Sequence, residues 1–191
     1  MCGIAGIWNL NGGTLEMSTL KKFTDSISHR GPDGSGYELL NNNALGFGHR
    51  RLSILDLSEA GKQPMFNESK DLVISFNGEV YNFIEIRKEL ITSGEKFETE
   101  TDTEVILKAY RKWGKDCLNK FNGMFAIAIW DVNTKELLLI RDRFGVKPLY
   151  YLFIPDVILA FSSETIAFKN LSGFNREVNQ KVLDIALAEP D

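Results

Sequence analysis

The segment Met124-Phe125-Ala126-Ile127-Ala128-Ile129-Trp130 decides the fold of this chain, because every one of its positions is apolar. A strand with one face in water alternates apolar and polar side chains, whereas an unbroken apolar run is typical of a strand buried on both faces. We therefore expect this strand to belong to a sheet that is covered on both sides.

Other segments predict the layers around this strand. Short apolar or alternating runs bounded by turn residues predict strands over 3–8, 37–40, 44–48, 71–76, 136–140, 149–153 and 157–161, and a non-helical turn over 29–34. Helical spacing predicts helices over 20–27, 83–91, the residues that follow the capping box Thr101-Asp102-Thr103-Glu104, and 182–187. These elements favour an α+β fold in which two antiparallel sheets pack face to face, with the helices outside.

The overall composition limits the function. The chain has 191 residues, of which 43% are hydrophobic and 25% charged, as is ordinary for one soluble domain. A net charge of −4 disfavours a nucleic-acid partner, and no apolar run approaches the roughly 20 residues that cross a membrane. Two cysteines make no disulfide framework, which favours the cytoplasm, and the two histidines show no zinc-site spacing. We interpret His29 as a structural hydrogen-bonding residue and Cys117 as a core thiol.

The second residue is the first candidate for catalysis. Cys2 follows Met1, and methionine aminopeptidase removes an initiator Met when the next side chain is small. Removal gives Cys2 a free α-amine beside its thiol, which combines a strong nucleophile with a built-in base. The reference pKa of an α-amine is about 7.7–8.0, so part of it is neutral at physiological pH. A retained Met1 would lock this amine in a peptide bond, and a purely structural cysteine is the alternative.

Asn77-Gly78 is a candidate oxyanion hole. It offers a side-chain amide and a backbone N–H where the strand over 71–76 is predicted to end. The glycine lets the backbone approach a ligand closely. The alternative is a plain Asn-Gly turn, which this dipeptide often forms.

Three charged residues are candidates for holding a substrate. Neighbours on a strand point to opposite faces, so at most one of Arg50 and Arg51 enters a pocket, where it could bind a carboxylate through two hydrogen bonds. Asp102 begins a predicted helix and could cap it or hold an ammonium group, although Thr101 can also serve as the cap. Solvated arginines and a capping aspartate are the alternatives. With a nucleophile and an oxyanion hole, these groups suit hydrolysis of a free amino-acid amide such as glutamine.

Several motifs together resemble one known family. They are Met1-Cys2-Gly3-Ile4-x-Gly6, His29-Arg30-Gly31-Pro32-Asp33, Arg51-Leu52-Ser53-Ile54, Phe76-Asn77-Gly78-Glu79-Val80-Tyr81-Asn82, Thr101-Asp102-Thr103-Glu104, Arg141-Asp142-Arg143-Phe144-Gly145-Val146-Lys147-Pro148-Leu149-Tyr150-Tyr151, and Ser163-Glu164 with Ala167. In this order they are similar to the glutaminase domain of the asparagine synthetases. These enzymes are class II glutamine amidotransferases, a group within the N-terminal nucleophile hydrolases.

The resemblance implies a four-layer αββα sandwich and a role for each site residue. It assigns the nucleophile to Cys2 and the oxyanion hole to Asn77 and the Gly78 amide. It implies that glutamine is held by a further set of residues: Arg51 for the α-carboxylate, Asp102 for the α-ammonium, and Leu52, Ser53, Ile54, Leu55 and Glu79 around the pocket.

The resemblance also implies a glutaminase domain over 1–175 and, over 176–191, the start of a connection to a C-terminal synthetase domain. That domain activates aspartate with ATP and is marked by a Ser-Gly-Gly-x-Asp-Ser loop, which these residues lack. We therefore expect the chain to be a piece of a longer protein. The glutaminase domain is expected to need no cofactor or metal, whereas ATP and Mg would serve the synthetase domain. The expected partners are L-glutamine and that domain, with a homodimer left open, and neither nucleic acid nor a membrane.

Alternatives remain for what the domain serves. The leading hypothesis is ammonia supply for asparagine synthesis, and a rival is supply to another acceptor, such as a sugar acid in surface-polysaccharide assembly. A non-catalytic interaction domain is the third, although such relatives often lose the N-terminal Cys. A glutaminase of the other type needs a nucleophile elbow and a His-x-Glu pair, and here Cys117 is followed by Leu118 and no such pair occurs.

Overall fold

The computed structural model describes residues 1–52, 61–174, 177 and 180–188. Two antiparallel sheets form its centre. The first has the order β2 (Gly34–Leu40), β3 (Leu45–Arg51), β1 (Gly3–Asn9), β9 (Ile158–Ser162) and β8 (Tyr150–Ile154). The second has the order β4 (Met65–Phe66), β5 (Leu72–Val80), β6 (Gly123–Asp131) and β7 (Glu136–Arg141).

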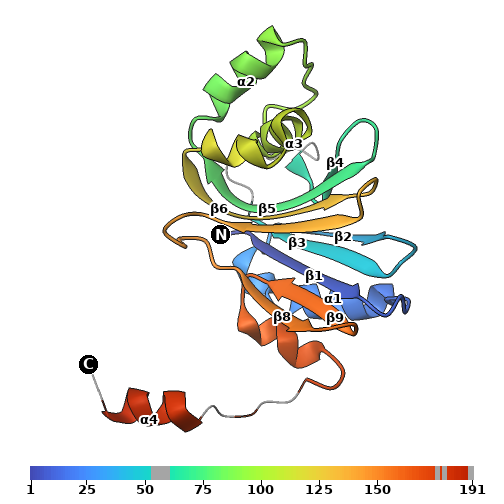
Figure 1. Cartoon of the computed structure of the whole chain (residues 1–191), viewed down its shortest axis with the longest axis vertical. Helices are drawn as coiled ribbons and strands as arrows, with labels where there is room; N and C mark the ends of the chain where they lie inside the picture. Colours follow the sequence, from blue (N-terminus) through green and yellow to red (C-terminus); the bar gives the residue numbers. More distant parts are fainter. Residues whose placement is uncertain (53–60, 175–176, 178–179, 189–191) are drawn as a thin grey trace.

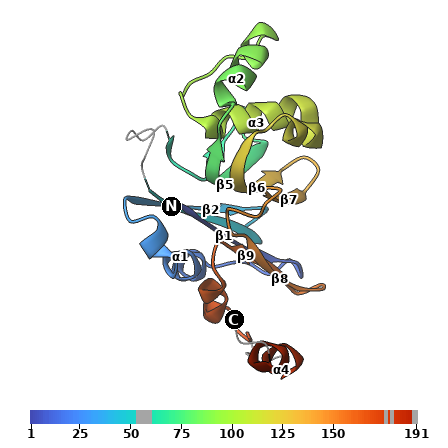
Figure 2. The same cartoon turned by 90° about the vertical axis from the view of Figure 1, so that its left-hand side faces the viewer.

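Helices cover the outer face of each sheet (Figures 1 and 2). Helix α1 (Met17–Asp25) lies on the first sheet, whereas α2 (Phe83–Thr92) and α3 (Asp102–Trp113) lie on the second. Short 3₁₀ turns follow at Ser28–Arg30, Gly114–Asn119 and Thr165–Asn170, and α4 (Gln180–Ala188) lies apart from the sandwich. This arrangement confirms the predicted αββα fold. No helix in the described part of the chain is long and apolar enough to cross a membrane.

Strand β6 shows why the layers form. Its residues Phe125, Ile127 and Ile129 belong to the apolar cluster shared with α2 and α3. Its alternate residues Ala126, Ala128 and Trp130 belong to a second cluster that fills the space between the two sheets. A third cluster lies between the first sheet and α1. The unbroken apolar run is therefore buried on both faces, as predicted.

Several element boundaries differ from the prediction. Strand β5 does not stop at Phe76 but continues through Val80, because it stays paired with β6 as far as Gly123. The two strands come so close there that a Cβ on Gly78 would lie 2.2 Å from the Met124 carbonyl oxygen. The segment 29–34 is also not a simple turn, since Ser28–Arg30 is helical and Gly34 already begins β2.

Smaller differences concern a helix face and a short strand. Ile91 is 52% exposed and not on the buried face of α2, which Ile86 and Leu90 provide. Strand β4 has only two residues, and its pairing with β5 was not predicted. The remaining strands and helices match the predictions to within a few residues at each end.

Candidate active site

The pleat of three strands places the predicted site residues in the layer between the sheets. In β1, Ile4 belongs to the cluster between the sheets, and Cys2 precedes it by two positions. In β5, Val73 belongs to the same cluster, and Asn77 and Glu79 follow it on the same face. Both views of the fold place the N-terminus between the sheets at one end (Figures 1 and 2).

Strand β3 separates the two arginines, as the alternation of side chains predicts. Arg50 faces α1, where its guanidinium lies 3.2 Å from Asp25 Oδ1 and donates to the Gly31 carbonyl at 3.2 Å. Arg51 is on the opposite face with Phe47, which packs between the sheets. The structure therefore places Arg51, not Arg50, on the inner face of the first sheet, which packs against the face of β5 that carries Asn77.

The thiol of Cys2 lies against the backbone of Leu52. The Leu52 N–H is 3.4 Å from Cys2 Sγ, and Cys2 Sγ is 3.6 Å from the Leu52 carbonyl oxygen. Cys2 is partly exposed, and Met1 before it is 58% exposed. The thiol is thus held in place and not enclosed in the core, as a reacting group requires. Ser53, Ile54 and Leu55, the next predicted pocket residues, lie outside the described residues.

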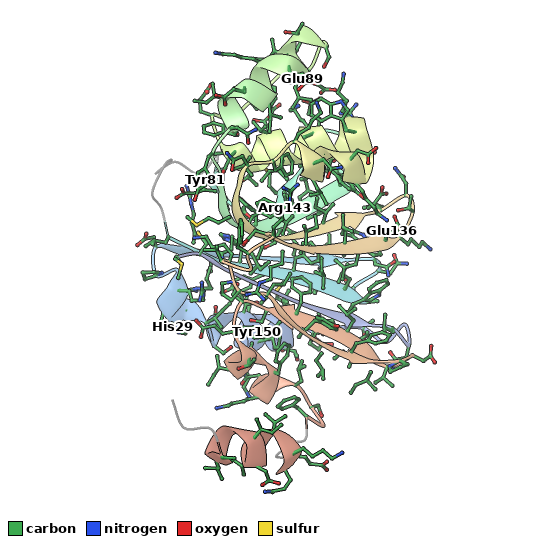
Figure 3. All side chains as sticks on the ribbon, turned by 60° about the vertical axis from the view of Figure 1, so that its left-hand side comes forward. His29, Tyr81, Glu89, Glu136, Arg143 and Tyr150 are labelled. Atoms are coloured by element: carbon green, nitrogen blue, oxygen red, sulfur yellow. The ribbon has the colours of Figure 1, made fainter. Side chains whose placement is uncertain are left out.

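Arg30 is a residue that the sequence reasoning missed. Its Nε donates to the Cys2 carbonyl at 3.0 Å, and its Nη1 donates to Glu164 Oε1 at 2.9 Å. His29 also contacts Glu164, with Nε2 3.0 Å from Oε1, as expected of a structural hydrogen-bonding residue. Figure 3 places His29 and Tyr81 at the same end of the molecule, on either side of the layer between the sheets. The signal for Arg30 was its motif His29-Arg30-Gly31-Pro32.

The hydrogen-bonding pattern of β5 shows which backbone groups point toward β6. The Tyr81 N–H donates to the Asn122 carbonyl, and the Val132 N–H donates to the Asp71 carbonyl. Since every second residue of an antiparallel strand is bonded to the same neighbour, the odd-numbered residues of β5 are those bonded to β6. The even-numbered residues therefore present their N–H groups at the opposite edge of the strand. Gly78 is one of them.

The N–H groups at this free edge have partners, with one exception. The Leu72 N–H donates to Asn67 Oδ1, and Ile74 pairs with strand β4. The Phe76 N–H donates to Gln63 Oε1, and the Val80 N–H donates to Asp102 Oδ2. Among the described residues, the Gly78 N–H has no acceptor. The structure thus corrects one detail of the prediction: Asn77-Gly78 is neither a turn nor a strand end, and its free donor is an edge amide inside the strand.

The side chain of Asn77 supplies a second free donor. Asn77 is 2% exposed, and its Nδ2 has no partner within the described part of the chain. A buried donor without an acceptor costs free energy, so such a group in a native protein needs an explanation, of which a catalytic role is one. Two adjacent residues of β5 thus present N–H groups that have no acceptor among the residues that the structure describes.

Asp102 lies at the start of α3. Thr101 caps this helix by accepting from the Glu104 N–H at 3.3 Å, as predicted, which leaves the Asp102 carboxylate free to reach β5. There Oδ2 accepts from the Val80 N–H at 3.2 Å. The capping box is not reciprocal, since Glu104 accepts from the Thr99 N–H at 2.7 Å and not from Thr101.

Burial gives Asp102 unusual titration behaviour. Removal from water raises its pKa to about 6; hydrogen bonds from Val80 and Thr103 oppose this rise, and the nearby charge of Glu79 adds to it. A positive group that binds next to the Asp102 carboxylate would therefore stabilise its charged form. Cys117 behaves differently, since burial raises the pKa of its thiol to about 12 and it packs in the core as expected. No group of three or more His, Cys, Asp or Glu residues in the described ranges is arranged to hold a metal ion.

Comparison with known proteins gives this geometry a family context. Residues 1–190 match the model of a family described as the glutamine amidotransferase domain. Asparagine synthetase (glutamine-hydrolyzing) 1 of Bacillus subtilis (strain 168) is 45% identical over 167 residues, which cover 86% of this chain and 26% of the relative. Putative asparagine synthetase (glutamine-hydrolyzing) 2 of Methanocaldococcus jannaschii is 41% identical over 199 residues, which cover 94% of this chain and 37% of the relative.

The chain thus spans between 26% and 37% of the length of these two relatives. Among solved structures, glutamine phosphoribosylpyrophosphate (PRPP) amidotransferase from B. subtilis, complexed with ADP and GMP, superposes with a TM-score of 0.73. That match covers 88% of this chain and 43% of the other at 23% identity, and it shows a shared fold.

Proposed function

The chain belongs to the glutamine amidotransferase family, and from this membership we propose that it hydrolyses L-glutamine to glutamate and ammonia through a Cys2 thioester. The observation that carries the proposal is a pair of donors without an acceptor among the described residues, Asn77 Nδ2 and the Gly78 N–H. Their strand, β5, packs against β1, the strand that follows Cys2. The family match confirms the resemblance drawn from the motifs. The roles of the individual residues are our proposal.

In the first half of the reaction, the Cys2 thiol transfers its proton to the α-amine of Cys2, and the sulfur attacks the side-chain amide carbon of glutamine. The carbonyl oxygen becomes an oxyanion, which accepts hydrogen bonds from Asn77 Nδ2 and the Gly78 N–H. The α-ammonium then gives its proton to the departing nitrogen, so that ammonia leaves and a γ-glutamyl thioester remains.

In the second half, water attacks the thioester carbon while the α-amine takes its proton. The same two donors stabilise the second oxyanion, and glutamate leaves as the thiol is regenerated. The α-amine of Cys2 therefore acts as the base in both halves of the reaction, and a chain that keeps Met1 has the thiol without this base. Arg30 contributes by holding the Cys2 carbonyl, which orients both the thiol and the amine.

Two charged residues would hold the ends of the amino acid. Arg51 offers a fork of donors for the α-carboxylate, and Asp102 offers a carboxylate for the α-ammonium. Glu79 lies on the same face of β5 as Asn77 and would complete the contacts. Leu52 would add backbone groups, together with Ser53, Ile54 and Leu55.

We further propose that the ammonia serves the ATP-dependent amidation of aspartate to asparagine by a C-terminal domain. The support is that both relatives above are named asparagine synthetases and are about three to four times longer than the aligned segment. In this proposal the glutaminase domain is 1–175 and the residues from 176 onward lead to the synthetase domain, which would use ATP and Mg. Hydrolysis itself would need no cofactor.

Labelling tests the proposed nucleophile. A glutamine-mimicking diazoketone should alkylate Cys2, and the intact mass should show that Met1 has been removed. Excess L-glutamine should protect the thiol, since both compounds compete for one site. Cys117 is a built-in control because it is 1% exposed and its raised pKa keeps it protonated. Label that appears on Cys117 alone would show that Cys2 is not the reactive residue.

The raised pKa of Asp102 predicts how glutamine binding depends on pH. Below a pH of about 6 the carboxylate takes up a proton and loses the charge that attracts the α-ammonium. In the Cys2→Ala variant, which cannot react, the Kd of glutamine should therefore rise as pH falls from 7 to 5, by up to about tenfold per unit. Calorimetric titration measures this.

The matched control is Asp102→Asn, which keeps the shape and is also a good residue near a helix N-terminus. In the Cys2→Ala background it should bind glutamine weakly, with a Kd that no longer changes between pH 7 and 5. Tight binding by the Asn variant would contradict the assignment of the ammonium to Asp102.

A further inference from the structure

Strand β5 loses its neighbour just before the proposed oxyanion hole. Strand β4 pairs with β5 only at Val73 and Ile74, so no strand in the described ranges lies beside the backbone of Phe76 at this edge. Both polar groups of Phe76 are nevertheless bonded, and both partners are side chains. The N–H donates to Gln63 Oε1 at 2.6 Å, and the carbonyl accepts from His49 Nε2 at 3.1 Å.

Gln63 extends this contact to a second element. It is 7% exposed, and its Nε2 donates to Thr103 Oγ1 at 3.3 Å. Thr103 is itself 4% exposed and lies in the first turn of α3, next to Asp102. One buried amide therefore joins the peptide before Asn77 to the helix turn that carries the proposed ammonium-binding carboxylate.

His49 makes the other bond to Phe76 as a neutral donor. It is 1% exposed, and burial lowers its pKa to about 4, so that the ring is uncharged at neutral pH. The carbonyl can only accept, which places the ring proton on Nε2. Both polar groups of the Phe76 backbone are thus bonded. Of their two partners, Gln63 is the one that also bonds a residue of α3.

We propose that Gln63 is a positioning residue of the glutamine site, which sets the distance between the oxyanion donors on β5 and the carboxylate on α3. The inference rests on the proposed function. A bond at residue 76 and a bond at residue 80 bracket the Asn77-Gly78 pair on one strand edge, and both lead to the first turn of α3 through Gln63 and Asp102. Loss of the first bond would let the donors shift relative to a bound glutamine.

The test compares three variants of the chain that begins at Cys2. Gln63→Met has a similar length but no polar group, and it should lower kcat for glutamine hydrolysis by about 10- to 100-fold, since small misplacements of catalytic donors have effects of this size. Gln63→Glu keeps an oxygen that accepts from Phe76 and should recover most of that loss. Thr103→Val removes only the bond to α3, so it should lower kcat less than Gln63→Met and raise KM more.

Asn67 provides the matched structural control. Its Oδ1 accepts from the Asp71 and Leu72 N–H groups at 3.1 and 3.0 Å, so it supports the same edge of β5 at the end far from the site. Asn67→Leu should lower Tm and leave kcat within about twofold of the parent chain. A merely structural Gln63 would give the same result as this control, which would overturn the proposal.

Amide hydrogen exchange separates this inference from the proposed function. Exchange at the Phe76 amide should accelerate in Gln63→Met, which removes its acceptor, and stay unchanged in Asn67→Leu. Unchanged exchange at Phe76 in Gln63→Met would overturn the inference even if the chain hydrolyses glutamine. A parent chain without glutaminase activity, together with faster exchange at Phe76, would instead contradict the proposed function and leave Gln63 as the residue that holds the strand.

Discussion

Cys2→Ala and Cys2→Ser should each abolish glutamine hydrolysis, with a loss of kcat of about 10⁴-fold or more. The alanine has no nucleophile, and the serine hydroxyl is far harder to ionise than a thiol, so the weak α-amine cannot activate it. Both variants should keep the fold and still bind glutamine, because Arg51 and Asp102 are untouched. Ammonia release measured at steady state, with binding measured by calorimetry, distinguishes these effects.

A chain that retains a residue before Cys2 is the matched control for this experiment. It has the same thiol in the same place, held by the Leu52 backbone, but its amine is part of a peptide bond. We expect this chain to be inactive as well, which would assign the base to the α-amine. Activity that survives in either Cys2 variant would require a different nucleophile.

Asn77→Ala should lower kcat by about 10²–10³-fold with a smaller change in KM. The reason is that Asn77 Nδ2 has no acceptor within the described residues of the free protein and gains one when the oxyanion forms. Removing a buried unpaired donor should also leave Tm unchanged or higher, unlike most buried polar substitutions. Steady-state kinetics and thermal melts on the same preparations measure both effects.

Ser75→Ala is the control for Asn77→Ala. Ser75 is fully buried two positions earlier on the same face of β5, and its Oγ donates to the Gly48 carbonyl at 3.3 Å. Its substitution should lower Tm and leave kcat nearly unchanged. If Asn77→Ala changed KM alone, Asn77 would belong to ground-state binding and not to the oxyanion hole.

The sequence predicted the faces of the sandwich better than the ends of its strands. Alternation of side chains correctly separated Arg50 from Arg51, because each residue's face depends only on its own position along the strand. The predicted end of the strand over 71–76 was wrong, because Asn77-Gly78 carries a strong local signal for a turn. Pairing with Gly123, which is distant in the sequence, overrides that signal and extends the strand.

The same limit explains which site residues were missed. Arg30 reaches the Cys2 carbonyl, and Gln63 reaches the Phe76 N–H, through contacts between segments that the chain brings together only on folding. The sequence does not show whether an Arg or a Gln will be buried, nor which backbone group its side chain will bond. The motif around Arg30 marked the segment as important but did not say which atom it would hold.

The two buried groups with displaced pKa values, His49 and Asp102, make opposite contributions to proton uptake on unfolding. Burial lowers the pKa of His49 to about 4, from 6.5 in the unfolded chain, so unfolding binds a proton between those values and the contribution of His49 to stability falls as pH drops. Burial raises the pKa of Asp102 to about 6, from 3.8 in the unfolded chain, so unfolding releases a proton between those values and the contribution of Asp102 to stability rises as pH drops. Between pH 4 and 6 these two contributions therefore oppose each other. Acid therefore discharges the carboxylate that binds the substrate without a matching loss of free energy of unfolding from this pair.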